Sequence, residues 1–410
     1  MLRSHYYSWP ILSGPPSPIQ YLYSSLTSSL PYLSQLLIGM LWFAALGCSS
    51  PQVSEATRQT SSPSSSEQVN IQYAEGFDIN YSQPHPTLSI TGSNDTARYV
   101  LLPTGASLPE GLAPSTQVIR TPVQRIVATS TTHLGLIEWL DAHDRLVGIG
   151  RADLVYDDTI RHRVREGRIQ EVGTDGALNI ELVLSLQPDV VMVSATPGVS
   201  MTQYQPLLSA GIPVIVNAEW MEASPLGKAE WVKLMAVLLQ QEEYVNQRFG
   251  TMASRYDSIA QRAQQTTQQP LVITGSPFQG SWYVPGRDSY VGQLLRDAQA
   301  TWPWSQDTSA VSFNVSLETV YPHGLEADYW INPGLTDRLS SLGEQDERLM
   351  AFQPYQQKEV YNYYRRTSPD GGNDYYEGGT VHPDLILADL VEIFHPEVLD
   401  HSLYYYQKLQ

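Results

Sequence analysis

Two stretches of the chain alternate short apolar runs with helical segments, and this alternation constrains the fold more than any other feature. In the first stretch the helical segments are 133–142, 180–186 and 203–209, and the apolar runs around them are 125–129, 146–149, 189–193 and 212–216. Apolar strands that alternate with helices predict parallel β-α-β units whose sheet is covered on both faces. We therefore expect an α/β lobe over residues 121–224.

The same alternation begins again after Pro270. Apolar runs at 271–274 and 327–331 enclose helical segments near 290–298 and 317–321. The two stretches also share a local signature, since Asn179-Ile180-Glu181 and Ser316-Leu317-Glu318 each place a polar cap and a first-turn glutamate at the start of a helix that leads to a strand. We expect a second, similar Rossmann-like lobe over 269–396, closed by an amphipathic helix at 383–394 and followed by a tail at 397–410.

A nearly continuous helical segment, 225–268, separates the two predicted lobes. Its second part carries apolar residues at spacings of three to five with Glu, Arg and Gln between them, namely Tyr244, Phe249, Met252, Tyr256 and Ile259. This spacing is typical of an amphipathic helix. We expect one helix to about Leu239 and a longer helix after it, which would join the lobes rigidly.

The region before the first lobe, 69–120, consists of short alternating runs separated by Gly, Pro and Asn. The strand-like runs are 71–73, 87–90, 98–102 and 117–120. Alternating runs bounded by turn residues predict β-strands. We therefore expect a β-rich extension in front of the first lobe.

The only cysteine, Cys48, follows an apolar run of eleven or twelve residues that closes on small residues. A membrane-spanning helix needs about 20 apolar residues, so this run suits the hydrophobic region of a secretory signal, although Arg3 is the only lysine or arginine before it. The sequence Ala45-Leu46-Gly47-Cys48 resembles a bacterial lipobox, which implies a diacylated Cys48 as the mature N-terminus. Residues 1–47 are thus predicted to be a signal peptide and 48–68 a flexible tether; a buried free cysteine is the alternative.

Composition and motifs disfavour several classes of function. The net charge of −18 disfavours nucleic-acid binding, and a single cysteine excludes an internal disulfide framework, a cysteine-based zinc site and an iron–sulfur cluster. The nine histidines form no His-x-x-x-His pair, and no phosphate-binding loop is present. We expect a binding protein with no catalytic residues, no metal site and no cofactor, and any ATPase on a separate subunit.

The order of these pieces over residues 120–396 resembles the substrate-binding lipoproteins of ABC importers for vitamin B12, ferric siderophores and haem. The segments that carry the resemblance are 125–133, 148–151, 179–192, 208–214, 282–290, 327–332 and 382–389. The resemblance implies two lobes joined by one long helix, with an iron–siderophore complex or a corrinoid bound between them. It also implies a location in the cell envelope, a lipid anchor, and a permease and an ATPase as partners; any iron or cobalt would belong to the ligand.

Ligand contacts are expected where strands end at the cleft, because open parallel sheets bind ligands at the carboxyl ends of their strands. In the first lobe the candidates are Thr131, Thr132, His133, Arg151 and Trp220; in the second they are Trp282, Arg287 and Trp304. Arginine and tryptophan suit large, flat ligands with carboxylate or phosphate groups. The alternatives are that the threonines cap a helix, that His133 is structural, and that the tryptophans belong to the lobe cores.

Two glutamates are candidates for contact with the permease. Receptors of the resembled family carry one docking glutamate on each lobe, and the matching positions are Glu181 and Glu318. The alternative is that each glutamate only complements the positive end of its helix.

Other functions remain open at this point. One is a haem or metal-ion receptor of the same transporter class, which would need an axial Tyr or His or several converging ligands. A hydrolase on a related two-lobed fold is a remote alternative, and a nitrogenase-like reductase would require cluster cysteines that the sequence lacks.

Overall fold

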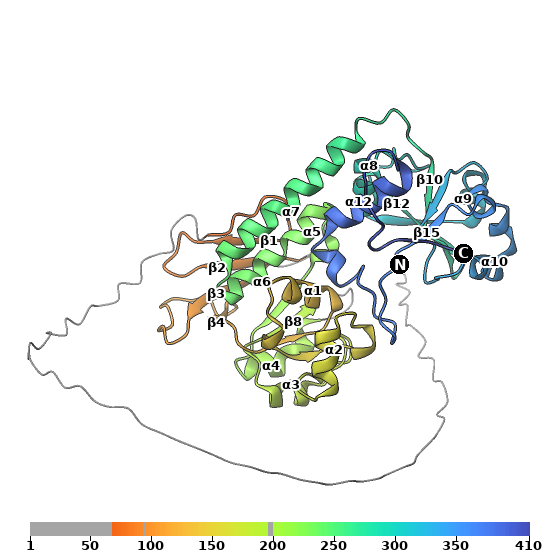
Figure 1. Ribbon diagram of the computed structural model, residues 1–410. Helices are drawn as coiled ribbons and strands as arrows, with labels where there is room; N and C mark the ends of the chain where they lie inside the picture. The colour runs from red at the N-terminus through yellow and green to blue at the C-terminus, as the bar shows by residue number, and fades with distance from the viewer. Residues whose placement is uncertain (1–67, 93–95, 196–199) are drawn as a thin grey trace, which may run out of the picture. The chain divides into compact units, whose positions relative to one another are not determined.

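A computed structural model describes residues 68–92, 96–195 and 200–410 of the chain. The predicted signal peptide, Cys48 and all but the last residue of the predicted tether lie outside the described residues. The described part is a mixed α/β structure, as the alternating pattern predicts (Figure 1).

The apolar runs of the first lobe form a parallel five-stranded sheet in the order β7-β6-β5-β8-β9. The strands are β5 (Ile126–Ala128), β6 (Leu146–Ile149), β7 (Gln170–Glu171), β8 (Val190–Ser194) and β9 (Val214–Asn217). The helices are α1 (Thr131–Trp139), α2 (Asp158–Arg165), α3 (Ile180–Leu186) and α4 (Gln205–Ser209), with short 3-10 turns η1 (His143–Arg145), η2 (Ala152–Leu154), η3 (Met201–Tyr204) and η4 (Glu219–Met221). The predicted strands and helices are thus confirmed, while α2 and β7 are additional.

The second lobe is built on parallel strands β10 (Val272–Thr274), β14 (Tyr329–Ile331) and β15 (Val360–Asn362), with β16 (Gln407–Lys408) antiparallel at the edge. A separate antiparallel sheet contains β11 (Pro277–Phe278), β12 (Ser281–Pro285) and β13 (Ser312–Val315). The helices are α8 (Tyr290–Asp297), α9 (Leu317–Gly324), α10 (Ser340–Gln345), α11 (Gln353–Gln357) and α12 (Pro383–Phe394), with 3-10 turns η5 (Glu347–Ala351) and η6 (Gly378–Thr380). The segments α9-β14 and α3-β8 therefore occupy corresponding places in the two lobes.

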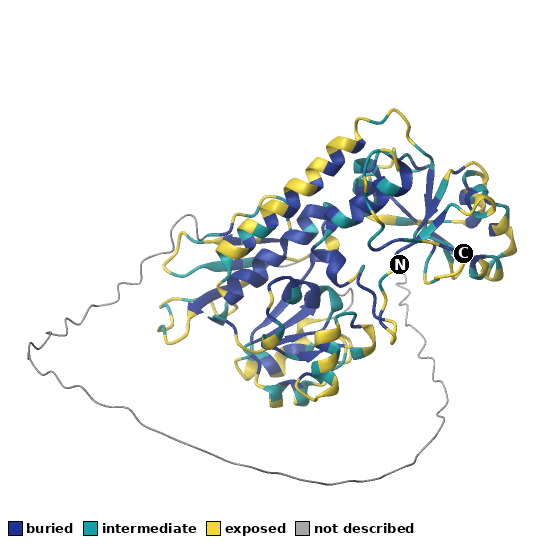
Figure 2. Cartoon of the chain, in the orientation of Figure 1, coloured by how far each residue is buried: buried dark blue, intermediate teal, exposed yellow. Residues whose placement is uncertain are grey.

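Three helices connect the lobes: α5 (Pro225–Glu230), α6 (Val232–Leu239) and the 22-residue α7 (Glu242–Ala263). Every residue of α6 is buried, whereas α7 buries one stripe that includes Phe249, Met252 and Tyr256 and leaves its other face exposed (Figure 2). Helix α7 packs against α6 and α12. Tyr244 was expected on the apolar face but is exposed, and its hydroxyl donates to the Asp141 carboxylate at 3.0 Å.

The extension forms a four-stranded sheet in the order β1-β2-β3-β4, with β3 and β4 parallel and the other pairs antiparallel. Its strands are β1 (Phe77–Asn80), β2 (Thr87–Thr91), β3 (Thr96–Pro103) and β4 (Gln117–Thr121). The strand expected at 71–73 was wrong. The backbone N–H groups of Gln72 and Tyr73 donate to the side chain of Glu230 instead of a neighbouring strand.

Two buried carboxylates hold the start of the extension against the connecting helices. Glu230 accepts hydrogen bonds from three successive backbone N–H groups, those of residues 72–74, at 2.7–3.1 Å. Glu222 accepts from the backbone N–H groups of residues 75 and 76 and from the indole of Trp231. The ammonium of Lys233 lies 2.6 Å from both Glu230 and the carbonyl of Asn70. Charges that are out of water require such partners.

The hydrophobic core continues from the extension into the first lobe and the connecting helices. Phe77, Leu136, Trp231 and Leu387 belong to one cluster of buried side chains. Val127 packs on the other face of the first-lobe sheet, so β5 is covered on both sides. Within the described residues, no helix combines the length and the apolar character that crossing a bilayer requires.

Candidate functional site

The carboxyl end of β5 leads directly into the first turn of α1. Ser130 caps this helix, because its hydroxyl accepts a hydrogen bond from the backbone N–H of Thr132 at 3.3 Å. Thr131 and Thr132 are partly exposed at that turn, and Thr132 also shares a hydroxyl contact with Ser130 at 2.9 Å. The two predicted threonines therefore lie at the sheet edge where a ligand is expected.

Asp175 connects the ends of several first-lobe strands. Its carboxylate accepts a hydrogen bond from the hydroxyl of Thr129 and another from the backbone N–H of Ser194 at 3.2 Å. Its backbone carbonyl accepts from the side chains of Gln203 and Tyr204. These contacts fix the loop after β7 against the ends of β5 and β8.

His133 and Glu219 form a buried polar pair of side chains behind this edge. His133 is fully buried, and its ring interacts with the backbone of Met192. Glu219 is 1% exposed, and its Oε2 atom has no hydrogen-bond partner among the described residues. Burial lowers the pKa of His133, while the carboxylates of Glu219 and Asp175 act in the opposite direction. In this conformation the imidazole is covered, so a ligand does not reach it directly.

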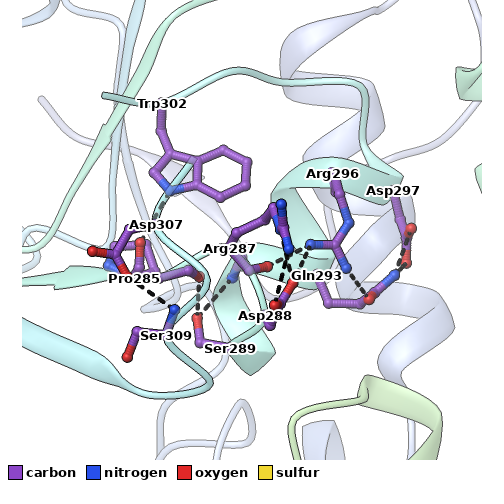
Figure 3. A network of polar contacts seen from close by, with 12 residues as sticks. Pro285, Arg287, Asp288, Ser289, Gln293, Arg296, Asp297, Trp302, Asp307 and Ser309 are labelled. Carbon is purple, nitrogen blue, oxygen red and sulfur yellow. Dashed lines mark hydrogen bonds and ion pairs between the residues drawn. The ribbon is translucent and has the colours of Figure 1, made fainter. Parts of the chain in front are cut away.

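The two predicted arginines lie on loops and are paired with aspartates close by in the chain. Arg151 is exposed and donates to Asp153 at 2.9 Å. Arg287 donates to Asp288 at 2.9 Å, and Arg296 adds a second cation 3.7 Å from the same carboxylate (Figure 3). These ion pairs are partly exposed and contribute little to stability. A ligand would have to compete with them for the guanidinium groups.

The loop that carries Arg287 is held tightly against α8. The hydroxyl of Ser289 accepts from the N–H of Gly292 at 3.2 Å and donates to the carbonyl of Gly286 at 2.8 Å (Figure 3). A Cβ atom on Gly292 would lie 2.1 Å from that same carbonyl oxygen. Position 292, where the loop and α8 meet, therefore requires glycine.

The three predicted tryptophans have different environments. Trp220 is 47% exposed in η4, just after β9. Trp282 is fully buried, donates its indole N–H to the carbonyl of Thr274 at 2.7 Å, and packs on Trp330. Trp304 is partly buried and meets the ring of His323 edge to face. Trp282 thus lies in the second-lobe core, which was the alternative for it.

Exposed aromatic residues that the sequence reasoning missed flank Trp282. Tyr283 is 54% exposed, and Phe278 on the adjoining strand is equally exposed. Alternation within β12 was the available signal, because neighbouring residues of a strand point to opposite faces. Both residues lie on the antiparallel sheet that follows the carboxyl end of β10.

A tyrosine-rich segment, 363–381, joins the two lobes. Arg366 pairs with Asp374 at 2.5 Å and lies over the rings of Tyr156 and Tyr404. The carboxylate of Glu377 accepts hydrogen bonds at 2.8 Å from the backbone N–H groups of Tyr156 and Asp157, which belong to the first lobe. Burial raises the pKa of Glu377 to about 8. This segment therefore forms part of the contact between the two lobes.

Glu181 and Glu318 occupy the same position in corresponding helices. Each is the second residue of its helix, after the caps Asn179 and Ser316, whose side chains accept from the helix backbone at 3.0 and 3.3 Å. Both glutamates are exposed. Glu318 also lies 3.2 Å from Arg348, and hydrogen bonds from its own backbone N–H, Ser316 and Arg348 lower its pKa.

Possible metal ligands and cavities give no further support to the predicted ligand residues. In the described part of the chain, no three His, Cys, Asp or Glu side chains are grouped to hold a metal ion. One cavity of about 370 Å³ lies between the start of the extension and α7, and its lining includes Asn70, Tyr73 and Asp257. Two others lie near the end of α7 and around 268–270. None of these three cavities is lined by a predicted ligand residue.

Comparisons with known proteins agree on one family and one fold. The model of the family described as periplasmic binding protein matches residues 126–332. An uncharacterized lipoprotein of Methanocaldococcus jannaschii is 25% identical over 298 residues, which are 70% of this chain and 69% of the relative.

Two solved structures are similar in fold. A possible iron-binding (periplasmic solute-binding) protein from Staphylococcus epidermidis has a TM-score of 0.53 at 15% identity, covering 67% of this chain and 100% of that one. The periplasmic heme binding protein HutB of Vibrio cholerae has a TM-score of 0.50 at 18% identity, covering 64% and 98%. Identities this low establish the fold alone.

Proposed function

The chain belongs to the periplasmic binding protein family, and on that premise we propose that it is the receptor of an ABC importer for an iron–siderophore complex or a corrinoid. The receptor captures its ligand between the two lobes and delivers it to a permease that works with a separate ATPase. Its role is binding and transfer rather than catalysis.

The observation that supports an importer role most directly is the pairing of Glu181 and Glu318. They are exposed, equally charged and placed at the second residue of corresponding helices in the two lobes. A permease built from two symmetric halves needs two such points on its receptor. Helix capping alone requires no match between the lobes.

The ligand surface that we propose combines Thr131 and Thr132 with the exposed aromatic residues Trp220, Tyr283 and Phe278. Aromatic faces suit a large ligand with flat apolar parts, and the hydroxyl groups suit its polar rim. Closure of the cleft would bring three further residues to the ligand, namely Arg151, Arg287 and Trp304. His133 and Trp282 are buried, and we assign them no direct contact with the ligand.

The test is a ligand panel on the purified chain. Ferric siderophores, cobalamins, haemin and divalent metal ions are each added, and the melting temperature and the fluorescence of Trp220 and the other tryptophans are recorded. We expect one class of chelate to raise the melting temperature and quench fluorescence, because a ligand that binds only the folded state stabilises it. Metal-free siderophore is the matched control. A panel without any shift would overturn the proposal.

A haem receptor is the second candidate, and the phenol pair of Tyr363 and Tyr376 favours it. Their oxygens lie 2.7 Å apart, and Tyr376 is 41% exposed near the lobe junction. Tyrosine is one of the axial ligands that proteins offer to haem iron. Haemin binding with a shifted Soret band that Tyr376→Phe abolishes would select this candidate over the siderophore and corrinoid.

We also propose that the protein is held in the cell envelope by lipids on Cys48. The similar archaeal protein described as a lipoprotein supports this attachment. Two acyl chains suffice for stable anchoring. Cys48→Ala should leave the precursor uncleaved or release the protein from membranes; full processing with unchanged membrane fractionation would contradict the anchor.

A further inference from the structure

Lys228 lies where the connecting helices meet both lobes. It belongs to α5, which contacts η4 of the first lobe and α8 and α12 of the second. The other five residues of α5 are buried, whereas Lys228 keeps partial access to solvent. Lys228 is therefore the residue of α5 that solvent reaches in part.

The ammonium group of Lys228 has no polar partner in the described part of the chain. Its Nζ atom lies 5.1 Å from the centre of the Tyr290 ring, at the start of α8, and no described carboxylate comes within ion-pair distance. Lys233, by contrast, has two oxygen partners at 2.6 Å. A cation largely removed from water is costly when it is left without a hydrogen-bond partner.

A carboxylate oxygen without a hydrogen-bond partner and a buried imidazole belong to the same surroundings. The Glu219 carboxylate acts electrostatically on both Lys228 and His133, and its Oε2 atom lacks a hydrogen-bond partner in the described part of the chain. Burial lowers the pKa of Lys228, and Glu219 opposes that shift without forming an ion pair. Lys228 and Glu219 thus retain unused hydrogen-bonding capacity, and of Lys228, Glu219 and His133 only Lys228 is partly exposed.

The other cations considered for the ligand differ from Lys228. Arg151 and Arg287 already donate to Asp153 and Asp288, and both arginines are partly exposed to water. Their charges are compensated before any ligand arrives. An acidic ligand group that reached Lys228 would give its ammonium group the oppositely charged partner that it lacks among the described residues.

We propose that Lys228 binds an acidic oxygen of the ligand, a carboxylate or a catecholate, and that the receptor thereby selects anionic chelates over neutral ones. This inference rests on the proposed function and adds the charge class of the ligand. It also gives the strongly acidic chain, with a net charge of −18, a local cation for an anion that the protein as a whole repels.

The experiment measures dissociation constants by tryptophan quenching with four probes at two ionic strengths. Ferric enterobactin carries three catecholates and haemin carries two propionates, whereas ferrichrome and cyanocobalamin are neutral. We expect the full chain to bind ferric enterobactin or haemin at least tenfold more tightly than the neutral probes. Which anionic probe binds identifies the source of the acidic oxygen.

Variants assign the selectivity to Lys228. Lys228→Met should weaken the affinity for the anionic probe at least tenfold and reduce the salt dependence of its binding. The affinity of Lys228→Arg should stay within about threefold of wild type. Glu219→Gln should bind the anionic probe equally well or more tightly. Lys358→Met removes the same charge from an exposed site and should change nothing. Lys228→Gln replaces Lys228→Met if melting curves show that the methionine variant does not fold.

The outcomes separate the inference from the proposed function. Tighter binding of ferrichrome or cyanocobalamin, or an anionic probe that binds Lys228→Met as well as wild type, overturns the inference and leaves the receptor role standing. Failure of all four probes together with the wider chelate panel overturns the receptor role and the inference with it.

Discussion

Asp189 and Asp328 make the same pair of hydrogen bonds in the two lobes. The carboxylate of Asp189 accepts from the backbone N–H of Arg125 at 2.9 Å, and that of Asp328 accepts from the N–H of Leu271 at 2.8 Å. The backbone N–H of each aspartate donates to the carbonyl of that same partner, at 2.8 Å in both lobes. Each aspartate thus joins the end of α3 or α9 to the start of the neighbouring strand.

Replacing these aspartates should destabilise both lobes through the same lost contact. We expect Asp189→Ala and Asp328→Ala each to lower the free energy of unfolding by about 1–2 kcal/mol. The hydrogen bond from a backbone N–H to an ionised carboxylate is charge-assisted, and each substitution removes it. Urea unfolding measures the loss. Asp337→Ala, at an exposed site, is the control and should change it by less than about 0.5 kcal/mol. A loss in only one lobe's variant would contradict the equivalence.

Gly135 should tolerate no side chain. A Cβ atom there would lie 2.0 Å from the carbonyl oxygen of Glu377, so Gly135→Ala forces α1 away from the segment that joins the lobes. We expect a loss of roughly 1–3 kcal/mol in unfolding free energy. Gly250→Ala on α7, where a Cβ atom meets open space, should instead stabilise the chain by up to about 1 kcal/mol. Equal changes in unfolding free energy for the two variants would show that α1 and the segment around Glu377 can move apart without cost.

The stability of the protein should fall as the pH rises from 5 to 8. Burial raises the pKa of Glu377 to about 8, so the folded protein holds a proton that the unfolded chain releases above about pH 4.5. Burial raises the pKa of Glu138 to about 7 in the same direction. Glu377→Gln imitates the protonated acid and should make the decline shallower by up to about 1.4 kcal/mol per pH unit.

Urea unfolding at pH 5, 6, 7 and 8 measures the decline. Glu326→Gln, at an exposed position, should leave the slope unchanged. An identical slope in Glu377→Gln and wild type would mean that Glu377 is ionised in the folded protein.

Adjacent residues of β12 should separate folding from ligand binding. Trp282 is fully buried, so Trp282→Ala should cost about 3–5 kcal/mol of stability. Tyr283 is 54% exposed, so Tyr283→Ala should change the free energy of unfolding by no more than about 0.5 kcal/mol. The same variant should have a lower affinity for the chelate that the panel identifies. Melting curves and binding titrations on both variants provide the test. Normal chelate affinity in Tyr283→Ala would remove this residue from the ligand surface.

Transport should depend on Glu181 and Glu318 together. We expect the double substitution Glu181→Gln and Glu318→Gln to abolish uptake while chelate affinity and melting temperature stay near wild type, because the exposed carboxylates contribute to docking rather than to the fold. Glu326→Gln, further along the chain after α9, is the control for uptake. Surviving uptake, or a parallel loss of chelate affinity, would rule out the docking role.

Much of the lobe architecture could be predicted because the signals are local. The cap at Asn179, the helix after it and the strand at 190–194 follow from residues within one short stretch. The short strands β15 and β16 could not be predicted, since each is two or three residues long and exists only through pairing between residues far apart in the chain. The 71–73 segment has strand-like alternation, but a distant carboxylate determines where its N–H groups point.

The site was harder to predict than the fold because exposure is a tertiary property. Trp220 and Trp282 look alike as residues after or within strands, yet one is exposed and the other lies in the core. The role of Lys228 could not be predicted from the sequence. Whether its ammonium group lacks an ion-pair partner depends on where the fold places the carboxylates.

The hold of Glu222 and Glu230 on residues 72–76 bears on where this chain can be cut. The family match begins at residue 126, yet both carboxylates lie inside the matched range and take five backbone donors from before it. A truncated protein that started at the family boundary would lose these five donors and leave Glu230 with Lys233 and Glu222 with Trp231. The extension therefore supplies contacts that buried carboxylates of the matched region use, and a cut at the family boundary separates those carboxylates from their backbone donors.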